Sequence, residues 1–313
     1  MTIQDFLIEG KKRLTGELKD IGVENYVVTT ADVVKTNDTR LHGLSLREED
    51  SIYGVTVYCD DLYERSEAGE DRDEIMNELV YRCMYSISVP KPPVTPAMFE
   101  MGLDDIRSCL TVRLLDTVRN KSYMSGKPYI DVGCGLALTA VINAEPSIMS
   151  EWVVSVTHDL LDALGCDSET LLTEAFENTM KIEPPVLIDL HDFRDGGAIF
   201  SLKDRRNLLE DSDCLKRDPS STYVLTNRSG WLGATVLFYP GIMKKLHEML
   251  GEYYLIPSSV HEFMVIPDTE DITVQGLHAI LAEGNQCAVE EGDVLSYNIY
   301  CYDAADDRLK IAA

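Results

Sequence analysis

The chain has 313 residues, of which 45% are hydrophobic, and a formal net charge of −26 from 54 acidic and 28 basic side chains. This length allows one large domain or two ordinary ones, and no apolar run approaches the roughly 18 residues of a membrane helix. A field of this sign repels phosphate backbones and anionic lipid, which argues against direct binding to nucleic acid or to a membrane.

The cysteine pattern bears on the cellular compartment. Eight cysteines are spread along the chain without a CxxC pair, and most stand in apolar runs, as Cys59 and Cys301 do. Reduced, buried thiols of a cytoplasmic protein fit this pattern better than a disulfide framework or a zinc site. The first residues also lack the basic patch and apolar core of a secretory signal. We therefore expect a cytoplasmic protein with no metal site and no cofactor.

The first part of the chain predicts a small α-β unit over residues 1–89. Hydrophobic periodicity predicts helices over residues 5–20 and 71–85 and strands over residues 25–30, 41–46 and 54–59. Four prolines within residues 90–96 cannot continue a helix or lie in a central strand, so we expect an extended connector there. Residues 97–313 then form the main domain.

The main domain begins with a less regular pattern. It predicts helices over residues 97–119, 159–164 and 169–180, a long apolar stretch over 127–143, and strands over 152–156 and 195–203. Thr157 stands where the N-cap of the second helix belongs, and Asp167 or Ser168 stands where the N-cap of the third belongs. Gly165 stands where a C-cap belongs.

The stretch from Thr222 to Pro267 organises the rest of the chain. It predicts strands over residues 223–226, 234–239, 253–256 and 263–267 and a helix over 241–251. A helix over 273–287 and strands over 295–302 and 308–311 follow. Strands and helices joined by hairpin links predict an α+β protein, with a central mixed or antiparallel sheet, flanking helices and a smaller N-terminal α-β unit.

A glycine motif at Asp131, Gly133 and Gly135 offers an alternative function. It resembles the first motif of methyltransferases that use S-adenosylmethionine, in which glycines let the backbone approach the cofactor. The alternative function is a methyltransferase with these three residues around the cofactor. Such a site needs a helix directly after the glycines, whereas residues 136–142 suit a strand at least as well, and this weakens the alternative.

No complete catalytic or metal-binding motif is present, and the catalytic residues are unknown. His261-Glu262 lacks the second histidine of a zincin helix, because Val265 stands at that position. Ser258 and Ser259 lack the flanking glycines of a nucleophile elbow. Hydrogen bonds within a turn account for these side chains most simply.

Hydrogen-bonding side chains at strand ends and turns nevertheless define where a pocket would lie. A sheet presents such side chains to a ligand at its ends. The residues we expect to line a functional pocket are Ser258, Ser259, His261, Glu262, Asn227, Asn285 and Ser296.

The order of motifs along the chain resembles one known family. The segments that carry the resemblance are Lys35-Thr36-Asn37-Asp38, His42-Gly43-Leu44-Ser45, Leu225-Thr226-Asn227 and, most specifically, Pro257-Ser258-Ser259-Val260-His261-Glu262. They are similar to the bacterial family catalogued as domain of unknown function 5688, over nearly the full length. The resemblance implies a bacterial, intracellular α+β protein and implies no known activity.

Acidity without a complete catalytic constellation predicts a non-catalytic binding or regulatory module. Its partner would be a basic protein, with an affinity that falls as salt rises. The same charge is also consistent with a role in solubility alone or with mimicry of nucleic acid. The sequence identifies no small-molecule ligand.

Overall fold

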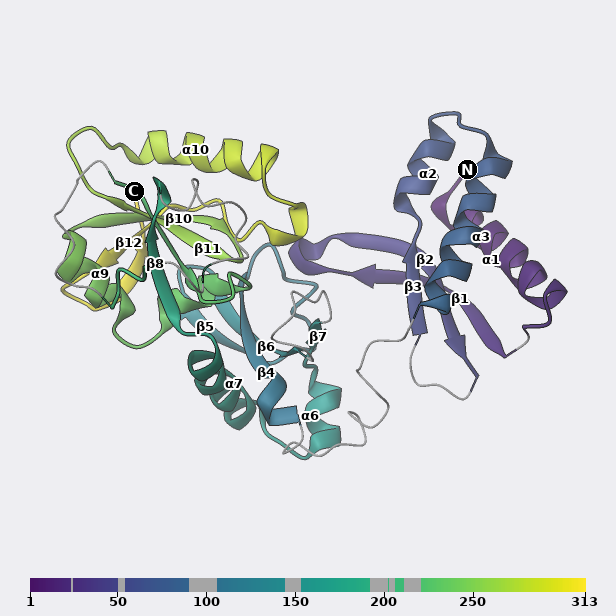
Figure 1. The fold of residues 1–313 in the computed structure, drawn as a ribbon, viewed down its shortest axis with the longest axis horizontal. Helices are drawn as coiled ribbons and strands as arrows, with labels where there is room; N and C mark the ends of the chain where they lie inside the picture. The colour runs from purple at the N-terminus through teal and green to yellow at the C-terminus, as the bar shows by residue number, and fades with distance from the viewer. Residues whose placement is uncertain are drawn as a thin grey trace. The chain divides into compact units, whose positions relative to one another are not determined.

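The computed structural model describes residues 1–23, 25–49, 54–89, 106–143, 153–191, 202, 206–210 and 221–313. The chain divides into two compact units, Met1–Gly102 and Leu103–Ala313 (Figure 1). The proline-rich connector expected at residues 90–96 lies outside the described residues. The division into domains 1–89 and 97–313 therefore stays a prediction.

The first unit is a three-stranded antiparallel sheet packed against helices. Its elements are α1 (Ile3–Asp20), β1 (Tyr26–Val34), the 3₁₀ helix η1 (Thr36–Asp38), β2 (Arg40–Glu48), β3 (Gly54–Tyr58), α2 (Asp60–Glu67) and α3 (Arg72–Ser88). The strand order is β1-β2-β3. Leu44 and Leu46 of β2 share a buried cluster with Leu7 and Leu14 of α1 and Leu79 of α3. Alternate positions of a strand face one side of its sheet, which places both leucines of β2 toward the helices.

The predicted helices and strands of the first unit are confirmed, and the short helix α2 is an addition. Two N-caps explain where the long helices begin. The Thr2 side chain accepts from the Asp5 amide at the start of α1, and the Asp71 side chain accepts from the Glu74 amide at the start of α3.

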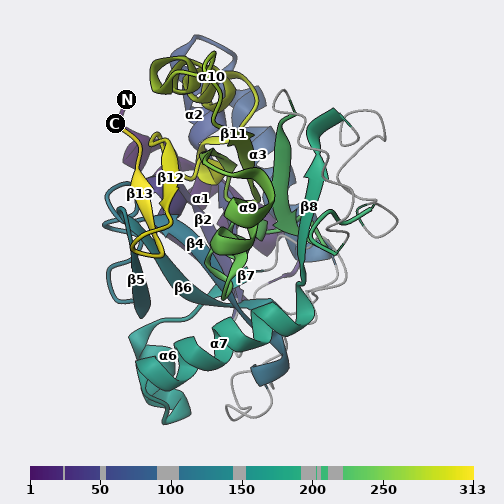
Figure 2. The same cartoon turned by 90° about the vertical axis from the view of Figure 1, so that its left-hand side faces the viewer.

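Within its described residues, the second unit contains two antiparallel sheets (Figure 2). Its elements are η2 (Arg107–Cys109), β4 (Leu110–Asp116), β5 (Tyr129–Gly133), β6 (Leu136–Asn143), β7 (Val153–Ser155), α6 (His158–Leu164), α7 (Ser168–Ile182), β8 (Pro185–Asp189), β9 (Tyr223–Asn227), η5 (Gly233–Phe238), α9 (Ile242–Leu250), β10 (Tyr253–Ser259), β11 (Glu262–Pro267), α10 (Val274–Cys287), η6 (Glu291–Asp293), β12 (Tyr300–Asp303) and β13 (Arg308–Ile311).

The larger of these sheets has the strand order β13-β12-β10-β11-β9-β8, and the smaller has the order β4-β6-β5 with β7 also paired to β6. Leu277 and Leu281 of α10 pack against Ile256 of β10 and Ile266 of β11. Helix α7 lies against β4 and β6. The predicted α+β class with flanking helices is confirmed, and every strand pairing in the described residues is antiparallel.

Four helices predicted in the second unit are confirmed as α6, α7, α9 and α10. Capping explains the agreement at α6, α7 and α10. The Thr157 side chain accepts from the Leu160 amide, the Asp167 side chain from the Thr170 amide, and the Thr273 side chain from the Gly276 amide. The strand predicted at residues 195–203 falls largely outside the described residues.

The helix predicted over residues 97–119 is wrong at residues 110–116. These residues form strand β4, which pairs along its whole length with β6. Strand β4 is buried on both of its faces and is largely apolar on both. These faces carry Leu110, Thr111, Val112, Leu114 and Leu115. A continuous apolar run has no periodicity that separates a buried strand from a buried helix.

The strand predicted over residues 234–239 is also wrong, because this segment forms the 3₁₀ helix η5. The chain turns at Leu232, which has a φ of +51°, and the Ala234 amide donates to the Val260 carbonyl oxygen. A β-branched composition favours a strand, but tertiary contacts override this weak preference.

The strand predicted over residues 295–302 is confirmed only from Tyr300 onward. Before it, the Asn298 amide donates to the Ser296 hydroxyl, which holds a turn. The predicted return strand at Arg308–Ile311 is confirmed as β13.

Candidate functional site

The predicted site residues centre on the turn between β10 and β11. The Ser259 hydroxyl donates to Glu262 Oε1 at 3.0 Å and accepts from the His261 amide at 3.0 Å. Ser258 lies half-buried at an irregularity in the strand pairing. The side chains of Ser259 and Glu262 therefore form hydrogen bonds within the turn itself. Hydrogen bonds of this kind are the simpler explanation that the sequence offered for these residues.

The imidazole of His261 points away from this turn hydrogen-bond pair. Its Nδ1 accepts from the Leu232 amide at 3.0 Å, and its Nε2 lies 3.5 Å from Asp293 Oδ2. Because the backbone amide can only donate, Nδ1 carries the lone pair and Nε2 carries the proton. The ring of Trp231 stacks beside it, with ring centroids 4.6 Å apart and planes tilted by 32°. The His261 side chain is 15% exposed.

Asp293 connects the histidine to two other elements. It lies at the end of η6, and its backbone carbonyl accepts from the Val260 amide at 2.9 Å. Its Oδ1 lies 3.8 Å from Nη2 of Arg113, which comes from β4. The hydrogen bond with His261 lowers the pKa of the Asp293 carboxyl, and the positive charge of Arg113 lowers it further. The carboxylate is therefore the stable form at neutral pH.

Asn227 holds the loop that carries Trp231. Its Oδ1 accepts from the Gly230 amide at 2.8 Å, and its Nδ2 donates to the Trp231 carbonyl at 2.7 Å. Next along the chain, Gly233 packs so closely that a Cβ atom would lie 2.6 Å from the His261 carbonyl oxygen. The loop, the turn and η6 thus form one connected cluster, which we call the His261 cluster: Asn227, Trp231, Ser259, His261, Glu262, Asp293 and Arg113.

Asn285 and Ser296 belong to a second set of hydrogen bonds. Asn285 Nδ2 donates to the Ser296 carbonyl at 3.3 Å, and the Tyr300 hydroxyl donates to the Ser296 hydroxyl at 2.8 Å. Both residues are buried. They hold the end of α10 against the segment before β12, which is a structural role.

Sequence reasoning missed three members of the His261 cluster. Trp231 is one of only two tryptophans in the chain, and its place in a glycine-flanked loop is a usable signal. Arg113 is the single charged residue inside an apolar run, which also marks it. Asp293 carries no such signal, because its neighbours Glu290 and Glu291 are also acidic.

The methyltransferase alternative is wrong in its structural premise. Gly133, Cys134 and Gly135 all have positive φ, and they form the tight turn of the β5–β6 hairpin. The Asp131 side chain accepts from the Gly133 amide and stabilises this turn. The segment after the glycines is the buried strand β6 and not a helix. The glycine turn therefore does not lead into a helix N-terminus, as a cofactor phosphate or carboxylate site of this type requires.

The two most buried cysteine thiols among the described residues are kept protonated by their burial. Burial raises the pKa of the Cys59 thiol to about 12 and that of the Cys83 thiol to about 12, so neither is a thiolate at neutral pH.

Within the described ranges, no group of three or more His, Cys, Asp or Glu side chains is placed to hold a metal ion. None of the described helices is both long enough and apolar enough to cross a membrane.

Comparison with known proteins gives one match. The sequence matches the family of unknown function DUF5688 over residues 3–304. The chain belongs to this family. The match covers both units and the whole His261 cluster, in agreement with the resemblance in the sequence motifs. No curated protein and no solved structure matches the chain.

Proposed function

We propose that this protein is a non-catalytic binding module whose partner is a basic protein. The observation that carries the proposal is the position of His261, the side chain best suited to acid–base chemistry among those the sequence singled out. The Leu232 amide occupies Nδ1, and Nε2 faces Asp293. Neither nitrogen of this ring is left to accept a proton from a substrate, which general-base catalysis requires.

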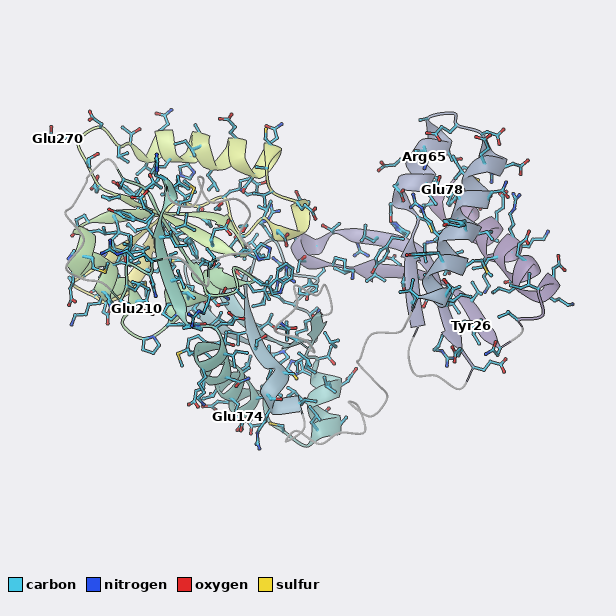
Figure 3. All side chains as sticks on the ribbon, viewed as in Figure 1. Tyr26, Arg65, Glu78, Glu174, Glu210 and Glu270 are labelled. Atoms are coloured by element: carbon cyan, nitrogen blue, oxygen red, sulfur yellow. The ribbon has the colours of Figure 1, made fainter. Side chains whose placement is uncertain are left out.

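The choice of a basic partner rests on charge. The net charge is −26, and exposed acids are spread over the second unit, as Glu210 and Glu270 illustrate in Figure 3. Such a field attracts positively charged surfaces and accelerates their association.

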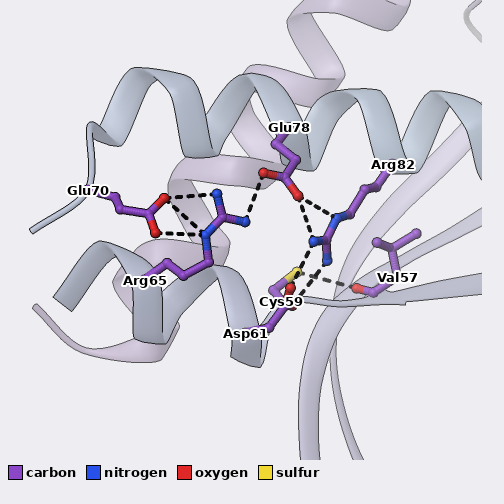
Figure 4. Close-up of polar contacts among 7 residues, drawn as sticks. All are labelled: Val57, Cys59, Asp61, Arg65, Glu70, Glu78 and Arg82. Atoms are coloured by element: carbon purple, nitrogen blue, oxygen red, sulfur yellow. Dashed lines mark hydrogen bonds and ion pairs between the residues drawn. The ribbon is translucent and has the colours of Figure 1, made fainter. Parts of the chain in front are cut away.

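Arg65 and Arg82 in the first unit offset this field only in part, because the two arginines are paired with three acids. Arg65 contacts Glu70 at 2.8 Å and Glu78 at 2.9 Å, and Arg82 contacts Glu78 at 2.6 Å and Asp61 at 2.8 Å (Figure 4). Hydrogen bonds from Arg82 and then Arg65 lower the pKa of the Glu78 carboxyl. We further propose that binding takes place in a bacterial cytoplasm, on the basis of the family resemblance and the pattern of isolated thiols.

The test measures binding of a fluorescein-labelled nona-lysine peptide to the full chain by fluorescence anisotropy. We expect saturable binding at about 50 mM salt that weakens at least about tenfold at about 300 mM, because salt screens exposed charges. The control is an unrelated folded protein of equal net charge. Binding that is no tighter than that of the control at low salt would overturn the proposal, since bulk charge alone would then explain it.

A further inference from the structure

Lys127 is a half-buried lysine near the end of the turns that join β4 to β5. Its side chain folds back onto Tyr123, four residues earlier, and Nζ lies 3.6 Å from the centroid of that ring. Nζ also donates a hydrogen bond to the backbone carbonyl oxygen of Tyr123. Lys121, on the same turns, is exposed. The amino group of Lys127 is therefore held against the protein, while that of a close neighbour is hydrated.

No carboxylate in the described part of the chain pairs with this amino group. The chain has 54 acids, and other lysines use them, as Lys181 does with Glu177 at 3.7 Å. Within the described residues, the polar and ring contacts of the Lys127 side chain are all with Tyr123. A half-buried lysine without a carboxylate loses hydration and gains no opposite charge in return.

Tyr123 holds a fixed position beside the amino group. The residue is 9% exposed, and its hydroxyl forms a hydrogen bond of 2.5 Å with the hydroxyl of Ser155 on β7. The turn itself is fixed to the start of α6, because the His158 amide donates to the Gly126 carbonyl oxygen at 2.9 Å. The ring therefore shields Lys127 from water on one side, while the incomplete burial of the lysine lets small molecules reach it.

Burial favours the neutral form of this amine. It lowers the pKa of Lys127, and the neighbouring Tyr123 opposes the shift only in part. A cation–π contact and a hydrogen bond to a carbonyl oxygen also stabilise the ammonium, but the loss of hydration outweighs them here. A lower pKa leaves a larger fraction of the lysine as the neutral amine at neutral pH, and the neutral amine is the nucleophile.

We propose that Lys127 is a covalent binding site for neutral aldehydes, a function that goes beyond the binding of a basic partner. The neutral amine attacks the carbonyl carbon, so that a C–N bond forms and the C=O π electrons move to the oxygen. Both amine protons and the aldehyde oxygen then leave as water, and an imine remains. No electrons are gained or lost overall, so the step needs no oxidant or reductant.

The charge of the protein and the ring of Tyr123 define the class of ligand. The net charge of −26 repels anionic carbonyl compounds such as keto acids. The aromatic ring beside the amino group offers an apolar surface for an apolar substituent on the aldehyde. A neutral aldehyde with an aromatic or aliphatic side chain meets both conditions.

The experiment treats the full chain with benzaldehyde at about pH 7 in the presence of cyanoborohydride, which reduces the imine to a stable secondary amine. Peptide mass spectrometry then gives the rate of labelling at each lysine. We expect Lys127 to be labelled about 3- to 10-fold faster than Lys121. In guanidinium chloride the chain unfolds, burial is lost, and the two lysines are expected to react at equal rates.

Two variants serve as controls. Lys127→Arg keeps the positive charge and is expected to remove the fast labelling, whereas Lys121→Arg is expected to leave it unchanged. If Lys127 reacts no faster than Lys121 in the folded chain, the inference is overturned. A preference that persists in the unfolded chain would overturn it as well, because the cause would then be the local sequence and not burial.

This inference and the proposed function fail separately. Lys127→Arg is expected to bind the nona-lysine peptide as the native protein does, because the amino group at this position takes no part in binding a basic partner. Loss of peptide binding in the native protein would overturn the proposed function and leave the labelling of Lys127 unaffected.

Discussion

Gly233 is a residue at which close packing against neighbouring backbone leaves no room for a side chain. A Cβ atom there would lie 2.2 Å from Thr226 Oγ1, 2.6 Å from the His261 carbonyl oxygen and 2.7 Å from the Asn227 amide nitrogen. Two of these three neighbours are backbone atoms that cannot rotate away. We expect Gly233→Ala to lower the free energy of unfolding by about 2–4 kcal/mol, measured by urea denaturation.

A second glycine in the same unit provides the matched control. Gly284 lies inside α10, and a Cβ atom there would meet nothing within 4 Å. Because alanine favours the helix, Gly284→Ala should raise the free energy of unfolding by about 0.5–1 kcal/mol. Equal effects of the two substitutions would contradict the close approach at Gly233.

At the scale of elements, the His261 cluster holds together pieces that are distant in the sequence. The Thr226 hydroxyl of β9 donates to the His261 carbonyl at 2.8 Å, while the His261 ring accepts from the loop before η5 and faces Asp293 of η6. Removing the ring leaves a backbone amide without its acceptor and a carboxylate without its donor.

The corresponding prediction concerns His261→Ala. The lost acceptor costs about 1–3 kcal/mol and the lost stacking on Trp231 about 0.5–1.5 kcal/mol, so we expect the free energy of unfolding to fall by about 1.5–4.5 kcal/mol. His278→Ala is the control, because His278 is exposed on α10 and should change stability by less than about 0.5 kcal/mol. An unchanged melting temperature for His261→Ala, together with lost peptide binding, would contradict this prediction. It would show that His261 acts in binding and not in stability.

At the scale of the whole molecule, buried tyrosines make the free energy of unfolding depend on alkaline pH. Burial raises the pKa of the Tyr300 hydroxyl to about 12, and burial also raises the pKa values of Tyr239 and Tyr253. The ordinary value of about 10 applies in the unfolded chain. The folded state therefore holds these protons longer than the unfolded state does.

The sign of the pH dependence follows from that difference. The stability contributed by Tyr300 is fully present below about pH 10 and is lost as pH rises through about 12. We expect the free energy of unfolding in urea to fall steadily from about pH 10 upward, with a smaller slope in Tyr300→Phe. A slope that is the same in both proteins would show that Tyr300 ionises at its ordinary pKa in the folded state.

Local chemistry explains the parts of the fold that the sequence predicted well. Helix α6 begins at the side chain of Thr157 and ends at Gly165, whose φ is +64°. The hairpin of β1 and β2 follows from two β-rich runs around a turn. These features depend on residues within a few positions of one another, so a single sequence carries the whole signal.

The sequence by itself determined the α+β class, most helix boundaries, the family and the acidic character of this protein. Only the tertiary structure decided that residues 110–116 form a strand and residues 233–238 a 3₁₀ helix, because packing from distant segments outweighs local preference there. It also decided the role of His261, whose partners Leu232 and Asp293 lie about thirty positions away on either side. No local pattern reports which donor will meet a given nitrogen, since that depends on how the whole chain packs.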